Sequence, residues 1–275
     1  MSGAGKLYAR LRQDLALIRG SLMESLAFRA SAITRVIANF VYLIIIYFLW
    51  RAIYDSSPTE VVNGMTFYDT MVYLVLASAM FNVLDAFIVW EIGRAYQKGE
   101  LVLCLVRPIS YQRHLFFGTI GGSIMLFVTT FLPTFVIVYL ITRGSFALGL
   151  NLLFFLISMC FSFIINFCVD FLVGTICLYT QSIWGVNVMK EVVVSLLSGA
   201  TIPLAFFPEK LRQVVNMLPF QAIYHTPLRL LTGRQLALSD YLQGLCVQLF
   251  WVVMLFGLGR LFWNRSMKNL TVNGG

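Results

Sequence analysis

The stretch "LNLLFFLISMCFSFIINFCVDFLVGTICLYT", Leu150 to Thr180, contains a single charged side chain, Asp170. About 20 apolar residues suffice for a helix to cross the hydrocarbon core of a bilayer, so this stretch is predicted to be a membrane-spanning helix. The whole chain has the same character, because 59% of its 275 residues are hydrophobic and 12% are charged. Soluble domains carry about 25% charged residues. The sequence therefore predicts an all-α integral membrane protein.

Six stretches of the chain are long and apolar enough to predict six transmembrane helices, although some contain polar residues. They are Ala32–Tyr54, Phe67–Trp90, His114–Thr142, Leu150–Thr180, Ile183–Phe207 and Tyr241–Trp263. The second and fifth stretches also contain charges.

Basic residues predict how these helices are oriented. They gather before the first stretch, between the second and third, and after the sixth, whereas the loop after the first, residues 55–64, has two acids and no base. Because cytoplasmic loops carry the excess of lysine and arginine, both termini are predicted to be cytoplasmic. The net charge of +8 is then a membrane-surface feature and predicts no nucleic-acid partner. One segment, residues 208–240, fits poorly, since it would lie outside yet holds four basic residues.

The N-terminal residues 1–30 have the pattern of an amphipathic helix. Apolar residues repeat there at spacings of three and four: Tyr8, Leu11, Leu15, Ile18, Leu22 and Leu26. Such a helix is expected to lie along the inner membrane surface. The alternative is a helix that packs within a cytoplasmic subdomain. Residues 31–268 would then form the transmembrane domain, and residues 269–275 a tail.

No motif for hydrolysis, metal binding or nucleophilic catalysis stands out. The "GAGKL" at Gly3 departs from a phosphate-binding loop, because that motif needs GxxxxGK[ST] after a strand. His114 and His225 have no acidic or cysteine residue nearby in the sequence, and the five cysteines show no metal-ligand spacing. We therefore expect that the chain is not itself an enzyme and binds no cofactor or metal.

A polar stripe runs along the fourth predicted span. Its members recur every fourth residue and so share one helix face: Ser158, Ser162, Asn166 and Asp170. Lys190 and Glu191 of the fifth stretch lie about as far after the turn at Gln181 as Asp170 lies before it. Asp170 and Lys190 are therefore expected to pair at similar depth, with Glu191 on a different face. The stripe is either a structural network or the lining of a substrate path.

Two segments between the spans have unusual compositions. The segment "LSGATIPLAFFPEKLRQVVNMLPFQAIYHTPLRLLTG", residues 197–233, predicts two short helices, Glu209–Met217 and Gln221–Leu231, separated by Leu218–Pro219–Phe220. They are too short to span and too apolar for a solvated loop, so residues 208–240 are predicted to form a re-entrant hairpin at the outer face. The second segment, Glu91 to Ser110, has a charged face and an apolar face, with a bend expected at Gly99 and an end at Pro108. A bent, charged amphipathic segment of this kind on the inner face is expected to bind a soluble partner.

These two segments resemble permeases of type-2 ATP-binding-cassette (ABC) exporters, in a bacterial branch of ABC-2 family transporter proteins. "GELVLCLVRPIS" resembles the family's Gly-x-Leu-x-x-x-Leu-x-x-Pro segment, and the matching residues are Gly99, Leu101, Leu105 and Pro108. The charged residues Glu100 and Arg107 within it are similar to those of that bacterial branch. The later segment resembles the family in these positions: Gly199, Pro203, Pro208, Pro219, Phe220, Tyr224 and Pro227. Arg94 and Lys98 depart from the family by making the first segment more basic.

The resemblance implies a function and a set of partners. Residues 91–110 would be the coupling helix that seats in a separate cytoplasmic ATPase, and the outer hairpin would help to close the exit. Two permeases, identical or related, would work with two ATPases that hold ATP and magnesium, in the inner membrane of a bacterium. The substrate would be an amphipathic or lipid-like molecule such as an antibiotic, peptide or lipid, or else a glycan. An ion-driven secondary transporter and a lipid-modifying membrane enzyme are the other classes considered.

Overall fold

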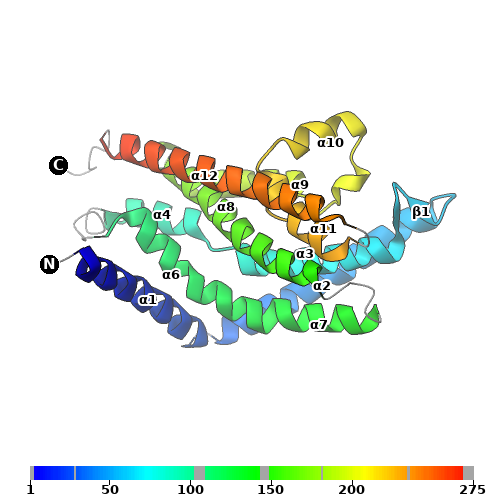
Figure 1. Cartoon of the computed structure of the whole chain (residues 1–275), viewed down its shortest axis with the longest axis horizontal. Helices are drawn as coiled ribbons and strands as arrows, with labels where there is room; N and C mark the ends of the chain where they lie inside the picture. Colours follow the sequence, from blue (N-terminus) through cyan, green and yellow to red (C-terminus); the bar gives the residue numbers. More distant parts are fainter. Residues whose placement is uncertain are drawn as a thin grey trace.

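The long helices lie roughly along one axis in the computed structural model, which describes residues 3–27, 29–101, 109–142, 149–180, 182–233 and 236–268 (Figure 1). The first half contains α1 (Gly3–Ala27), α2 (Arg29–Asp55), α3 (Phe67–Leu84), α4 (Ile88–Gln97), α6 (Tyr111–Leu126), the π-helical turn η1 (Phe127–Phe131) and α7 (Leu132–Ile141). The second half contains α8 (Leu150–Thr180), α9 (Ile183–Leu197), η2 (Leu204–Phe206), α10 (Glu209–Asn216), η3 (Phe220–Ala222), α11 (His225–Thr232) and α12 (Leu238–Lys268). The start of α1 and the end of α12 lie at the same end of the molecule (Figure 1).

Five helical segments among the described residues are long and apolar enough to cross a membrane. They are Thr34–Asp55, Phe67–Gln97, Tyr111–Ile141, Leu150–Thr180 and Leu238–Lys268. The predicted count of six is not confirmed, because α9 ends at Leu197 instead of continuing to Phe207. Its 15 residues rise about 22 Å, less than the roughly 30 Å of a hydrocarbon core. The helix stops there because Gly199 adopts a φ of +82° and Pro203 follows.

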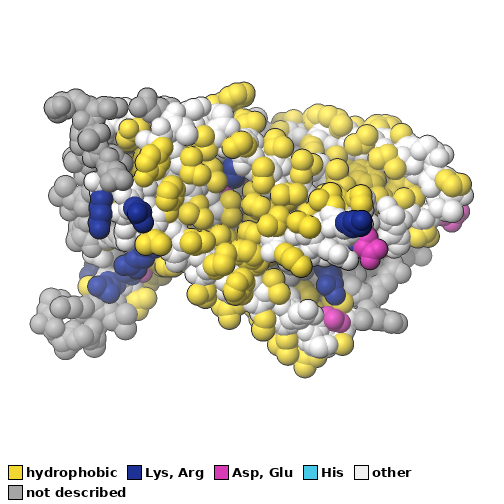
Figure 2. Space-filling view, turned by 90° about the horizontal axis from the view of Figure 1, so that it is seen from above, with side chains coloured by type: hydrophobic (Ala, Val, Ile, Leu, Met, Phe, Trp, Pro, Cys, Tyr) yellow, Lys and Arg dark blue, Asp and Glu magenta, His cyan; other side chains and the backbone are white. Residues whose placement is uncertain are grey.

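The surface agrees with a membrane environment. Hydrophobic side chains cover most of the visible middle of the molecule, and the visible charged groups gather mainly toward its two ends (Figure 2). Phe40 and Phe48 of α2, for example, are 65% and 63% exposed. Soluble monomers rarely expose continuous apolar surface on this scale, so these faces contact lipid or another chain.

A small hairpin joins α2 to α3. Strands β1 (Val61–Val62) and β2 (Met65–Thr66) pair antiparallel, with Val61 opposite Thr66 and Val62 opposite Met65. Asn63 and Gly64 both take positive φ, as a two-residue turn of this kind requires. Thr66 then caps α3 by accepting from the Asp69 N–H, while the Asp69 carboxylate accepts from the Thr66 N–H.

The second predicted span is interrupted close to its end, which sequence periodicity does not reveal. The helix ends at Leu84, Phe87 takes a φ of +51°, and α4 begins at Ile88. A break inside a membrane leaves backbone groups without partners unless the protein supplies them. Here the Asn166 side-chain amide donates to the Leu84 carbonyl at 2.9 Å. The polar stripe of α8 therefore stabilises the break.

The third predicted span also deviates from a regular helix. The Leu132 N–H bonds to the Phe127 carbonyl, five residues back, which makes η1 a π-helical turn. Pro133 follows immediately and has no N–H to donate, so a local widening of the helix is expected there. Stacked rings fill this region, with Phe131 5.3 Å from Phe127 and 5.5 Å from Phe155 between ring centroids.

Helix α1 packs along α6 and points most of its predicted apolar stripe outward. A Cβ on Gly121 would lie 2.3 Å from the Ile18 carbonyl oxygen, so the two backbones are nearly in contact. The Arg113 guanidinium donates to both carboxylate oxygens of Asp14, which is buried. Leu15, by contrast, is 65% exposed. We propose that this outward apolar face lies against the inner membrane surface.

Candidate functional site

Residues 91–110, here called the predicted coupling segment, begin inside α4. Helix α4 packs tightly between two other helices. Its Gly93 leaves room for Ile183 of α9, since an added Cβ would lie 2.5 Å from Ile183 Cγ1. On the other side, Gly174 of α8 leaves room for Ile92, which is fully buried. The apolar face of α4 is therefore used inside the chain.

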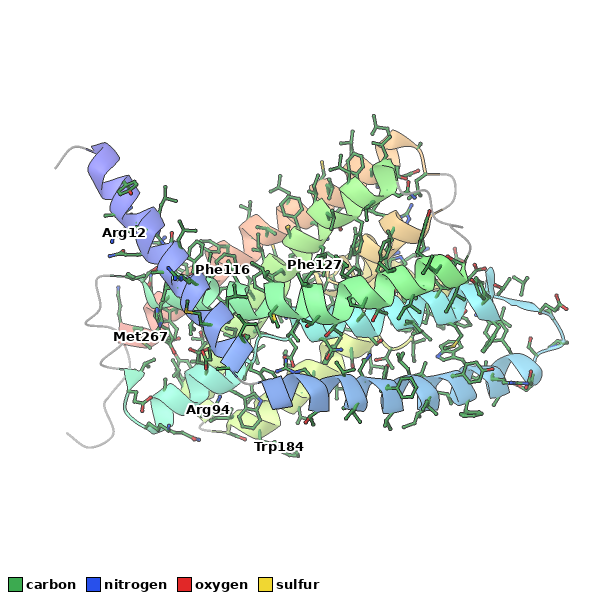
Figure 3. All side chains as sticks on the ribbon, turned by 90° about the horizontal axis from the view of Figure 1, so that it is seen from below. Arg12, Arg94, Phe116, Phe127, Trp184 and Met267 are labelled. Atoms are coloured by element: carbon green, nitrogen blue, oxygen red, sulfur yellow. The ribbon has the colours of Figure 1, made fainter. Side chains whose placement is uncertain are left out.

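The exposed face at the end of α4 is charged. Arg94, Lys98 and Glu100 are all exposed, and Gly99 takes the φ of +71° that the predicted bend requires. Arg94 lies toward the end of the molecule where Met267 marks the last turn of α12 (Figure 3). Leu101 is different, because it is only 2% exposed and belongs to the hydrophobic core. Leu101 is thus covered by the chain itself, and its contact with an ATPase stays a prediction.

The remaining residues assigned to the coupling segment, Leu105, Arg107 and Pro108, lie outside the described residues.

The polar stripe of α8 is buried along its whole length, and its members contact four different parts of the chain. Ser158, Ser162, Asn166 and Asp170 are each at most 5% exposed. Asn166 bonds to the break after α3, as described above. Ser162 donates to the Ala222 carbonyl of η3 at 3.2 Å. Gln248 of α12, which is also buried, donates to the Ser158 carbonyl at 3.1 Å.

Asp170 and Lys190 form the ion pair that their similar depth predicts. The Lys190 Nζ lies 3.1 Å from Asp170 Oδ1, and the two side chains are 9% and 1% exposed. Glu191 starts from another face of α9, but its carboxylate turns back and lies 3.5 Å from the same Nζ. Asn187 also donates to Glu191 at 3.2 Å. A buried ammonium is thus shared between a fully buried carboxylate and one that is 35% exposed.

The segment from Gly199 to Gly233 contains two short helices, α10 and α11, joined by a buried turn, and α11 begins at His225 where the prediction began at Gln221. The prolines stand at the boundaries of its elements: Pro203 precedes η2, Pro208 precedes α10, Pro219 precedes η3 and Pro227 lies in the first turn of α11. Tyr224 is 2% exposed, and Phe220 packs partly buried against the core. The His225 N–H donates to the Ser198 carbonyl at 3.1 Å, which ties the segment back to the end of α9.

The Ala222 carbonyl shows how deeply this segment enters the bundle. Gln248 donates to it at 2.8 Å and Ser162 at 3.2 Å, so α8 and α12 both hold the same backbone oxygen. At the far end of the segment, Asn151 of α8 donates to the Gly233 carbonyl at 3.0 Å. Gln248 and Asn151 were not singled out from the sequence, although each is an isolated amide in an apolar run.

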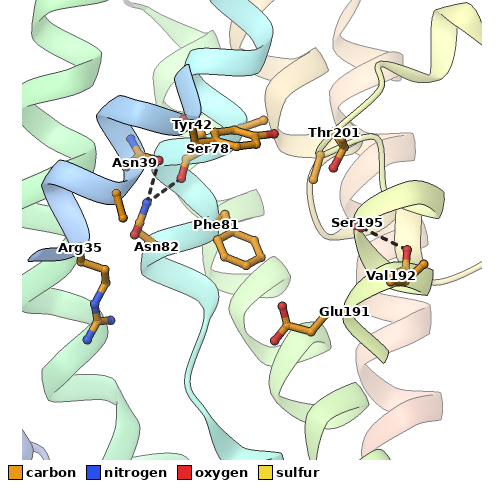
Figure 4. Close-up of a pocket in the computed structure, with 13 residues that line it drawn as sticks. Arg35, Asn39, Tyr42, Ser78, Phe81, Asn82, Glu191, Val192, Ser195 and Thr201 are labelled. Atoms are coloured by element: carbon orange, nitrogen blue, oxygen red, sulfur yellow. Dashed lines mark hydrogen bonds between the residues drawn. The ribbon is translucent and has the colours of Figure 1, made fainter. Parts of the chain in front are cut away.

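A groove lies between α2 and α9, with α3 between them (Figure 4). Its volume is about 420 Å³, and its lining combines apolar or aromatic side chains with about as many polar or charged ones. The residues that line it are Arg35, Ala38, Asn39, Tyr42, Ala77, Ser78, Phe81, Asn82, Glu191, Val192, Ser195, Ala200 and Thr201. Only Glu191 of this set was predicted as a site residue. Arg35 was overlooked because it falls inside the first predicted span.

No group of three His, Cys, Asp or Glu side chains that could hold a metal ion occurs in the described part of the chain.

Comparison with protein families identifies the class of this membrane protein. A family model described as ABC-2 family transporter protein matches residues 40–274, which includes both segments that carry the sequence resemblance. A search of curated proteins finds no match. Such permeases are the membrane components of ABC transporters and lack ATPase activity, which a partner supplies. The chain therefore belongs to the ABC-2 transporter family and is a multi-pass membrane permease of an ABC transporter.

Proposed function

We propose that the chain is the transmembrane subunit of an ATP-driven exporter that moves an amphipathic or lipid-like substrate out across a bacterial inner membrane. The observation that carries this proposal is the groove between α2 and α9, where charged, polar and apolar side chains line one space. Sites of this volume and mixed lining suit small amphipathic molecules. A glycan-exporting ABC permease is the alternative, since the same wall also offers hydrogen-bonding side chains.

The assembly that we propose contains two permeases, either two copies of this chain or this chain with a related one, and two cytoplasmic ATPase subunits. ATP and magnesium would be bound by the ATPases. Both chain termini would be cytoplasmic, with α9 and the segment that follows it completing the sixth crossing. Residues 1–30 would form the interfacial helix, 31–268 the transmembrane domain with a re-entrant hairpin at 208–240, and 269–275 the tail.

A route from the docking surface to the groove follows from the packing of α4. The exposed groups Arg94, Lys98 and Glu100 are available to an ATPase, while the buried face of α4 is held between α8 and α9. Tightly packed helices move together, because their contacts leave no free volume between them. A displacement of α4 would therefore be passed to α9, which carries Glu191 and Ser195 of the groove wall.

The proposal is tested by isolating the tagged chain from its native membranes and identifying every partner present in stoichiometric amount. We expect an ATPase to co-purify and the eluate to hydrolyse ATP. Reversing two exposed charges, Arg94→Glu with Lys98→Glu, is expected to release the ATPase and leave the permease folded. Lys210→Glu, an exposed reversal on α10, is the matched control and is expected to retain it. Retention of the ATPase by the double reversal would overturn the assignment of the docking surface.

A further inference from the structure

The positive charge of Arg35 stands out among the groups that line the groove. Arg35 lies near the start of the apolar segment Thr34–Asp55 and is only partly exposed. No carboxylate of a described residue lies within 4.0 Å of its guanidinium. The guanidinium instead lies over the Phe87 ring, whose centroid is 5.7 Å from Arg35 Cζ. At the end of a membrane-spanning segment a long basic side chain can keep its charge at the membrane surface, where it is able to bind an anionic group.

Arg35 also borders a second, more polar cavity of about 270 Å³, which Glu24 and Asp85 line as well. Neither of these carboxylates lies within ion-pair distance of its guanidinium. Arg35 therefore shares this cavity with two carboxylates but forms no direct ion pair with either of them.

Asn39 supplies a second donor beside Arg35. The two residues are four positions apart on α2 and so lie on the same helix face. The Asn82 amide nitrogen donates to Asn39 Oδ1 at 3.3 Å and to the Ser78 carbonyl at 2.9 Å (Figure 4). The Asn39 side-chain oxygen is used as an acceptor in this arrangement. Its side-chain nitrogen is therefore still available as a donor, since no described residue accepts a hydrogen bond from it. Arg35 and Asn39 together offer hydrogen-bond donors with no matching acceptor among the described residues.

The carboxylate across the groove does not supply that acceptor. Glu191 shares the Lys190 ammonium with Asp170 and receives the Asn187 amide at 3.2 Å. Among the described residues that line the groove, the donors left without a bonded acceptor are therefore those of Arg35 and Asn39. Guanidinium and amide donors recognise phosphate and carboxylate groups through charge-assisted hydrogen bonds.

The charged side chains of the groove lie toward one of its ends. Arg35 and Glu191 lie toward the end where α2 begins and α3 finishes, while Tyr42 and Thr201 lie further along (Figure 4). The wall between them includes Ala77, Phe81 and Val192, together with Ser78 and Ser195. A molecule with a charged head and an apolar body matches this order.

We propose that the groove binds an amphipathic molecule with an anionic head of the phosphate or carboxylate type, held by Arg35 and Asn39, with its apolar body along α3 and α9. That this molecule is the transported substrate rests on the function proposed above. The binding itself does not, because it requires only the groove of this chain.

The test uses the full chain with its partners in dodecyl maltoside, a neutral detergent. Ser195→Cys places a reporter thiol in the groove, in a background where Cys104, Cys160 and Cys246 are alanine. The rate of maleimide labelling at position 195 is then measured with added dodecyl phosphate, dodecyltrimethylammonium or inorganic phosphate. At a probe concentration about ten times its Kd, about one site in eleven stays free, so dodecyl phosphate is expected to slow labelling about tenfold.

Variants of Arg35 connect this protection to the proposed contact. Arg35→Gln is expected to weaken dodecyl phosphate binding about tenfold or more, since it removes a charge-assisted hydrogen bond. Arg35→Lys keeps the charge and is expected to bind dodecyl phosphate with intermediate affinity. Such a result would show that the loss in Arg35→Gln comes from the missing contact and not from misfolding. Arg51→Gln is the matched control, because Arg51 lies on the same helix, is 57% exposed and pairs with Asp55. It is expected to leave binding unchanged.

Four outcomes would overturn the inference. Equal protection by dodecyltrimethylammonium would show that head charge is not recognised. Full protection by inorganic phosphate alone would show an anion site with no role for an apolar body. Unchanged dodecyl phosphate binding in Arg35→Gln would show that Arg35 only reaches toward the membrane surface. An ATPase that co-purifies without any protection refutes the groove inference alone, whereas protection without a co-purifying ATPase refutes only the exporter proposal.

Discussion

The buried pair of Asp170 and Lys190 gives the sharpest prediction of stability. Removing one partner of a buried ion pair leaves an uncompensated charge and costs about 3–5 kcal/mol of unfolding free energy. Lys190→Met should show this full cost, because it leaves the fully buried Asp170 carboxylate beside Glu191 with no cation. Asp170→Asn should cost less, about 1–3 kcal/mol, because Lys190 keeps Glu191 at 3.5 Å.

The double variant Asp170→Asn with Lys190→Met should recover most of this loss. Replacing both buried charges with neutral side chains of similar volume is often close to neutral in free energy, so we expect it within about 1 kcal/mol of the unchanged protein. Thermal unfolding of the purified permease in detergent measures these differences. At about 2–4 °C per kcal/mol, the cost of about 3–5 kcal/mol means that Lys190→Met should lower the midpoint by about 6–20 °C.

The exposed pair of Arg51 and Asp55 provides the control. Its Nε–Oδ2 distance is 3.7 Å and its side chains are 57% and 73% exposed, so Arg51→Gln should cost less than about 1 kcal/mol. If Lys190→Met and Asp170→Asn shift the midpoint no more than this control, the buried pair is not formed. A double variant as unstable as the sum of the single ones would refute the reasoning from charge compensation.

Transport by the same double variant decides the role of the stripe. Recovery of both stability and transport assigns Asp170 and Lys190 to a structural network, whereas recovered stability with lost transport places them on the substrate path.

Three further changes test individual contacts. Gly121→Ala should detach α1 from α6 and speed the digestion of α1 by trypsin, because the new Cβ would lie 2.3 Å from a backbone oxygen. Gly118→Ala is the control and should not speed digestion, because nothing lies within 4 Å of its added Cβ. Equal digestion of both variants would refute the close packing. Asn166→Ala should cost about 1–3 kcal/mol by leaving a buried carbonyl at the helix break without its donor, and an unchanged unfolding midpoint would show that the break has another partner. Gln248→Leu should cost a similar amount and expose the Gly199–Gly233 segment to protease; unchanged protection would mean that Ser162 alone holds it.

The apolar spans and the short helices were predictable because both depend on local sequence. Long apolar runs indicate membrane helices, and four prolines mark the boundaries of η2, α10, η3 and α11. The contact between Asp170 and Lys190 was also predictable, since equal distances from one turn give equal depth in an antiparallel hairpin.

The features that sequence reasoning missed depend on contacts between distant segments. The break at Leu84 is stabilised by Asn166, which lies 82 positions away in the chain. Leu101 was assigned to the coupling surface through the family pattern and the apolar face of its segment, and burial by the core of the same chain is not visible in that pattern. Arg35 was overlooked because a single charge inside an apolar run does not show whether a carboxylate of another helix will meet it.

The central claim, transport driven by a partner ATPase, is tested most directly by flux in sealed vesicles that contain the purified complex. Transbilayer movement of a fluorescent anionic lipid is followed with Mg·ATP, with no nucleotide, and with an imposed proton or sodium gradient. The account predicts movement that requires Mg·ATP and persists when a protonophore collapses the gradient. Movement by the permease alone, driven by an ion gradient in the absence of ATP, would contradict it and identify an ion-coupled transporter.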